Sequence, residues 1–145
     1  MNTTNTILRP TSYMVIAVAA LLWNLIGLAM FILQVRMTPE TLAALPPEQQ
    51  AIHAATPSWI NVLFGIAVIA GVLGSLGLLL KKRWSVPLLL LSMLGVIAQL
   101  LAAYAVTPAF ALTGFGGLVL PIVLVLISGF LWLYARKAAT RGWLA

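Results

Sequence analysis

Long apolar runs, separated by short polar segments, make up most of this chain. Residues 10–35 and 57–80 form two such runs, and residues 84–135 form a third that contains no Asp, Glu, Lys, Arg or His. One helix needs roughly 20 apolar residues to cross a hydrocarbon core of about 30 Å, so the third run is long enough for two spans. The pattern therefore predicts four membrane-spanning helices, at about 12–36, 57–80, 85–106 and 118–138.

The polar segments predict how these spans are connected. Residues 81–83 read Lys-Lys-Arg and form a tight turn between the second and third spans. Residues 37–56 and 107–117 are the predicted external loops. In the longer loop, Thr38-Pro39-Glu40 places a capping residue before a proline and an acid, as at a helix start, and Pro46-Pro47-Glu48 repeats the pattern. The whole chain, 1–145, is expected to be one all-α domain, an integral membrane four-helix transmembrane bundle.

Composition and charge agree with this interpretation and add an orientation. The chain is 63% hydrophobic and 7% charged, whereas soluble domains carry roughly 25% charged residues. Of the 8 Lys and Arg residues, all except Arg36 lie beside span ends that share one side if the chain zigzags. This positive-inside bias predicts a cytoplasmic N-terminus and a cytoplasmic C-terminus. It also explains the net charge of +6 without nucleic acid, since the cations can face anionic lipid head groups of the bilayer.

Small residues on the second and third spans predict close helix packing. Tight van der Waals contact must replace the hydrophobic driving force between helices in lipid, and small residues spaced by three or four allow it. The second span is therefore expected to be central, and its glycine face could alternatively dock the helix of another protein. The packing residues are Gly65, Gly71, Gly74, Ser75 and Gly95.

Five residues within the predicted spans are candidates for contacting a solute. Four of them are Asn or Gln residues whose amides share helix faces with small residues, so these amides are predicted to converge in a polar pocket that opens outward. Trp23 is included because it lies at depth in its span, whereas other tryptophans suit the interfacial belt. The alternative is that the amides only form hydrogen bonds between helices. The candidates are Trp23, Asn24, Gln34, Asn61 and Gln99.

The missing residue types exclude several classes of chemistry. The chain has no cysteine, and no acidic or basic residue lies inside a predicted span, which argues against an ion-coupled pump or transporter. His53 is the only histidine and has only Glu40 and Glu48 near it in sequence, too few ligands for a metal site. No residues suit a hydrolytic triad. We therefore expect no catalytic residue, no metal, no cofactor and no enzymatic activity.

Four stretches carry motifs that extend over nearly the whole chain. They are 22–27 (LWNLIG), 38–46 (TPETLAALP), 55–59 (ATPSW), and 136–137 (RK) together with 142–144 (GWL). Together they resemble a family of small bacterial four-helix inner-membrane proteins that are commonly labelled sugar transporters. The resemblance implies a location in the bacterial cytoplasmic membrane and a transport function.

Three functional hypotheses follow. The first is a passive carrier or facilitator of a neutral solute such as a sugar, working as a homo-oligomer because four helices leave little room for a transport path. The second is a non-transporting accessory subunit of a larger membrane complex, favoured by the missing charges and the glycine face. The third is a lipid-binding membrane protein.

Overall fold

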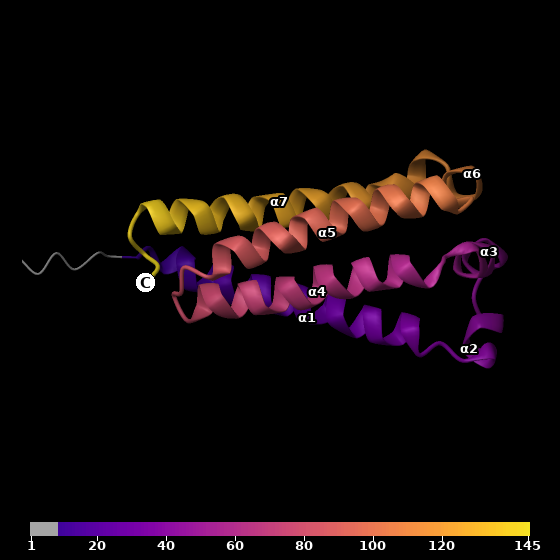
Figure 1. Ribbon diagram of the computed structural model, residues 1–145, viewed down its shortest axis with the longest axis horizontal. Helices are drawn as coiled ribbons and strands as arrows, with labels where there is room; N and C mark the ends of the chain where they lie inside the picture. Colours follow the sequence, from indigo (N-terminus) through magenta and orange to yellow (C-terminus); the bar gives the residue numbers. More distant parts are fainter. Residues whose placement is uncertain (1–8) are drawn as a thin grey trace, which may run out of the picture.

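Four long helices run the length of the molecule in the computed structural model, which describes residues 9–145 (Figure 1). Their bounds lie close to the predicted spans, and the described residues contain no strand. The predicted fold class, an all-α four-helix bundle, is therefore confirmed. The long helices are α1 (Thr11–Val35), α4 (Ser58–Leu79), α5 (Ser85–Val106) and α7 (Val119–Thr140).

Length and composition make each long helix able to cross a membrane. α4 and α5 contain 22 residues each. At 1.5 Å per residue such a helix is about 33 Å long, enough for a hydrocarbon core of about 30 Å. The chain is thus a multi-pass membrane protein with four candidate spans.

Short helical elements gather at one end of the bundle, which we call the capped end (Figure 1). α2 (Pro39–Ala43) and α3 (Pro47–Ala55) follow α1, and Thr38 caps α2 by accepting a hydrogen bond from the Thr41 amide at 3.2 Å. After α5 the sequence predicted only a loop over 107–117. The structure instead forms α6 (Ala109–Thr113) and the 3-10 helix η1 (Phe115–Leu118), separated by Gly114 at φ +66°.

The long helices pack in chain order: α1 on α4, α4 on α5, and α5 on α7. α4 is the most buried of the four. A Cβ added at Gly74 would lie 2.7 Å from Leu89 Cγ, and one added at Gly95 would lie 3.0 Å from Ala67 Cβ. These glycines let the backbones of α4 and α5 approach closely, so the closest packing lies between these two helices.

The main apolar core lies at the opposite end, which we call the basic end. Here α1 meets α7, with the rings of Tyr13 and Tyr134 6.1 Å apart and the Trp143 ring edge-on to Tyr13 at 6.0 Å. The Tyr13 hydroxyl donates a hydrogen bond to the Leu78 carbonyl. Trp143 and Leu144 are buried, so the C-terminal residues belong to this core. Figure 1 shows the C-terminus and the start of α1 at the same end of the bundle.

Candidate functional site

A small polar cluster joins α1, α4 and α5 near the middle of the bundle. The Asn24 side-chain amide donates to Ser75 Oγ at 3.0 Å and to the Ala20 carbonyl at 2.8 Å. Ser92 Oγ donates to the Ala67 carbonyl at 2.7 Å. Gly71 provides the space between them: a Cβ there would lie 2.9 Å from Asn24 Cγ and 3.0 Å from Ser92 Oγ. We call Asn24, Gly71, Ser75 and Ser92 the central polar cluster.

A second amide pair links α1 to α4 nearer the capped end. Gln34 Nε2 donates to Asn61 Oδ1 at 2.7 Å, and both side chains are half-buried. Asn61 lies in the first turn of α4 and Gln34 in the last turn of α1, so this pair sits well away from the central polar cluster. The two pairs connect the same helices at different depths.

Gln99 belongs to neither pair. It lies on α5 in register with Ser92 and Gly95, which contact Ala67 of α4. Its side chain is half-buried and forms no hydrogen bond to any side chain or backbone group among residues 9–145. Trp23 is also half-buried, next to Asn24. The structure therefore pairs Gln34 with Asn61 and Asn24 with Ser75, and leaves Gln99 by itself.

The five predicted packing residues lie at helix contacts. Gly71, Gly74 and Gly95 sit where α1, α4 and α5 approach one another, and Ser75 is fully buried against Asn24. Gly65 receives the ring of Phe31, whose Cζ would be 2.9 Å from an added Cβ. The glycine face of α4 is thus covered within the chain by Asn24 and Leu89, so a foreign helix would have to bind α4 elsewhere.

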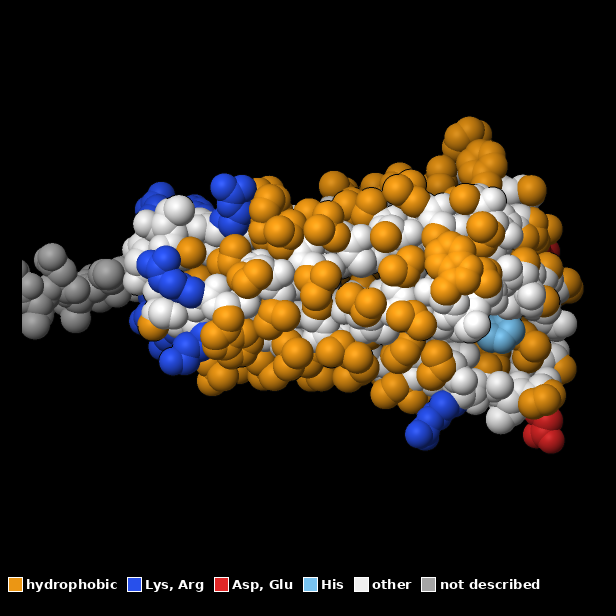
Figure 2. Space-filling model, viewed as in Figure 1, with side chains coloured by type: hydrophobic (Ala, Val, Ile, Leu, Met, Phe, Trp, Pro, Cys, Tyr) orange, Lys and Arg blue, Asp and Glu red, His pale blue; other side chains and the backbone are white. Residues whose placement is uncertain are grey.

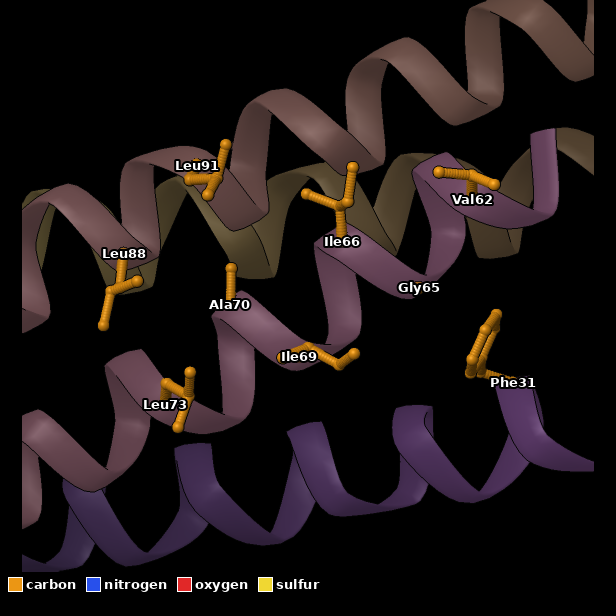
Figure 3. Close-up of a pocket in the computed structure, with 9 residues that line it drawn as sticks. All are labelled: Phe31, Val62, Gly65, Ile66, Ile69, Ala70, Leu73, Leu88 and Leu91. Carbon is orange, nitrogen blue, oxygen red and sulfur yellow. The ribbon is translucent and has the colours of Figure 1, made fainter. Parts of the chain in front are cut away.

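An apolar groove runs along the outer face of α4, between α1 and α5 (Figure 3). Its volume is about 420 Å³, and its α4 residues recur at intervals of three and four, which gives a continuous stripe. None of the five candidate solute-contacting residues lines it. The lining residues are Phe31, Val62, Gly65, Ile66, Ile69, Ala70, Leu73, Leu88 and Leu91.

Phe31 shapes the end of this groove that is nearer the capped end. Its ring packs edge-on against Phe64 at 5.4 Å and lies over Gly65. On the α5 side, Leu88 and Leu91 form the opposite wall (Figure 3). Sequence reasoning did not find the groove, because Ile66, Ile69 and Leu73 look the same in sequence whether they face lipid, a partner or a neighbouring helix.

Residues suited to metal binding do not gather in the part of the chain that the structure describes. No three His, Cys, Asp or Glu side chains come together within residues 9–145. His53 lies in the last turn of α3, and Glu48 lies in its first turn. What residues 9–145 do provide are the two hydrogen-bonded side-chain pairs between α1 and α4 and the apolar groove on α4.

Comparison of the chain with protein-family models, with curated proteins and with solved structures returned no match. The resemblance to the small four-helix membrane proteins therefore stays a prediction.

Proposed function

We propose that this chain is a small accessory subunit of a larger membrane complex, and that one transmembrane helix of the partner occupies the groove on α4. The observation that carries this proposal is the shape and composition of the groove. Its α4 stripe from Val62 to Leu73 is about 16 Å long at 1.5 Å per residue, more than half of a hydrocarbon core of about 30 Å.

The surface of the groove alternates between small and large side chains, as the contact surfaces of paired membrane helices do. Small residues, Gly65 and Ala70, lie between larger side chains of α4, and the flanking walls come from α1 and α5. Gly65 already holds the ring of Phe31 and Ala70 is buried, so a partner helix would place its own side chains between the exposed Ile and Leu side chains of the groove. The groove lining is apolar, which suits a helix surface and does not suit a polar solute.

The positions of the amides support the same proposal. Asn24, Gln34 and Asn61 already form hydrogen bonds within the chain, so they serve to hold α1 against α4. Interhelical bonds of this kind contribute about 0.6 to 2 kcal/mol each in membranes. A solute that used these amides would first have to break those bonds.

A pair of tryptophan substitutions tests the accessory role. Ile69 is 50% exposed in the groove, and Leu126 is 66% exposed on α7, away from it. After mild extraction from native membranes, Ile69→Trp should lose a stoichiometric foreign subunit that the wild type and Leu126→Trp both retain. The proposal fails if the wild type purifies without any foreign subunit, or if both variants retain it equally.

A passive facilitator of a neutral solute such as a sugar is the second candidate, and Gln99 favours it. An amide without a partner is costly at membrane depth, so Gln99 would gain from contact with water, with a solute or with a second copy of the chain. If the protein is a facilitator, reconstituted vesicles should take up a neutral sugar, and Gln99→Leu should abolish that uptake. Vesicles with wild-type protein that take up no more sugar than empty vesicles would refute this candidate.

We also propose that the basic end faces the cytoplasm of a bacterium and that the protein lies in the cytoplasmic membrane. The distribution of Lys and Arg supports this, since all except Arg36 lie at that end. The chain has no cysteine, so single cysteines report topology directly. In intact cells a membrane-impermeant maleimide should label Gln49→Cys on α3 and should not label Thr140→Cys. The reverse labelling would invert the proposed orientation.

A further inference from the structure

The last residues of the chain fold back over the turn between α4 and α5. The Ala145 amide donates to the Lys81 carbonyl at 2.8 Å, and the Arg83 amide donates to the Ala145 carbonyl at 2.9 Å. Gly142 adopts φ +74°, which reverses the chain after α7. Trp143 and Leu144 are then buried. We call residues 142–145 the C-terminal clasp.

The clasp also holds the start of α1. Arg9 Nε donates to the Trp143 carbonyl at 2.9 Å, across nearly the whole length of the sequence. Cations from three distant chain segments are therefore brought together by one short peptide. The basic residues at this end are Arg9, Lys81, Lys82, Arg83, Arg136, Lys137 and Arg141.

These cations have no acidic side chain near them. The chain contains two acidic residues, Glu40 in α2 and Glu48 in α3, and both lie at the capped end. Figure 2 shows most of the visible Lys and Arg side chains at one end of the bundle, and acidic side chains, with one basic side chain nearer to them, toward the other end. Like charges gathered at one end of a molecule repel one another, so the basic end favours an anion from outside the chain.

The surroundings of these cations indicate that the anion is a lipid rather than a soluble molecule. Leu80 and Trp84 flank the basic turn and are 58% and 44% exposed, so an apolar surface continues directly from the cations. The Arg136 guanidinium lies 5.0 Å from the centre of the Trp132 ring, which orients it beside an aromatic side chain typical of the membrane interface. A ligand that satisfies both surfaces has an anionic head and apolar tails.

We propose that the basic end binds the head-group phosphates of anionic phospholipids, and that the clasp acts as a positioning element for this site. Each Lys or Arg near an anionic membrane surface strengthens binding roughly fivefold. Neutralising the three residues of the basic turn should then weaken the preference for anionic lipid roughly 100-fold. This proposal does not depend on a partner in the α4 groove.

The test is competitive lipid binding by the full chain. Purified protein is placed in nanodiscs that contain phosphatidylglycerol and phosphatidylcholine with the same acyl chains, and native mass spectrometry measures which lipid remains bound after release. The test variant combines Lys81→Gln, Lys82→Gln and Arg83→Gln, and the matched control is Arg36→Gln at the capped end. The clasp is tested separately by Trp143→Ala against Trp59→Ala, with circular dichroism to check helicity.

We expect the wild type and Arg36→Gln to retain phosphatidylglycerol selectively, with a preference that high salt reduces, and the triple variant to show a preference weakened roughly 100-fold. Equal retention of both lipids by the wild type would overturn the proposal, as would an unchanged preference in the triple variant. If free glycerol phosphate displaces the lipid at equal concentration, the site is one for soluble phosphates and the lipid assignment is wrong. A helical Trp143→Ala protein with full preference would refute the role of the clasp.

Discussion

Replacement of Gly71 by alanine tests whether the central polar cluster holds three helices together. The added Cβ would lie 2.9 Å from Asn24 Cγ and 3.0 Å from Ser92 Oγ. Asn24 must then move away from α4, which breaks its hydrogen bond to Ser75. Overpacking of this kind costs about 1 to 3 kcal/mol, and the lost interhelical bond adds about 0.6 kcal/mol.

The magnitude can be separated into its causes with a double-mutant cycle. Asn24→Ala alone loses the hydrogen bond to Ser75 and should cost about 0.6 kcal/mol. In the Asn24→Ala background the Asn24 atoms that would contact a Cβ at Gly71 are absent. Of the neighbours near that Cβ, Ser92 Oγ remains. The double variant should therefore be about 1 to 2 kcal/mol more stable than the sum of the single variants predicts.

Unfolding in mixed micelles, followed by circular dichroism and by fluorescence of the 5 tryptophans, measures these free energies. Gly116→Ala is the matched control, because a Cβ at Gly116 meets nothing within 4 Å. It should change the free energy of unfolding little. The packing described for Asn24 would be refuted if Gly71→Ala and Gly116→Ala changed the free energy of unfolding equally. It would also be refuted if the effects of Asn24→Ala and Gly71→Ala were additive.

Three further substitutions address the basic end and the start of α5, each by its free energy of unfolding in the same assay. Lys81 has φ +62°, so Lys81→Gly should stabilise by about 1 kcal/mol, whereas a loss of stability would show that its backbone is not strained. Ser85 Oγ is buried and has no hydrogen-bond partner among residues 9–145, so Ser85→Ala should be neutral or stabilising; destabilisation by more than about 1 kcal/mol would contradict this. Trp143→Ala removes a ring packed against Tyr13 and Tyr134 and should cost about 3 kcal/mol, unless the clasp contributes nothing to the core.

The fold class was predictable because membrane spans obey a strong local rule. Backbone groups in lipid must be satisfied within the helix, so a long apolar run has one available structure. The basic residues at 81–83 indicated a turn, and α4 and α5 end and begin beside it. Helix formation over 107–117 was missed, because Pro108 and the glycines there are typical of both loops and short helices.

The candidate site was harder to predict because it depends on contacts between helices. The small residues of α4 predicted close packing, but the sequence does not determine which neighbour fills the space beside each glycine. Asn24 contacts Gly71 and Ser75, and Gln34 bonds to Asn61, because α1 lies against α4 at a particular rotation and height. The prediction that the amides of Asn24, Asn61 and Gln99 converge in one pocket requires rotations of these helices about their axes that differ from those in the structure.

Hydropathy, charge and turn chemistry by themselves determined the spans, their connections and the concentration of cations at one end, since each is a property of neighbouring residues. Only the tertiary structure decided that the amides pair at two depths, that the outer face of α4 is hollowed, and that residues 142–145 join the basic turn to Arg9. These features need residues far apart in sequence to meet at specific distances. Those distances depend on how each helix is rotated and how closely the backbones approach. In lipid, both the rotation and the approach follow from packing over the whole bundle.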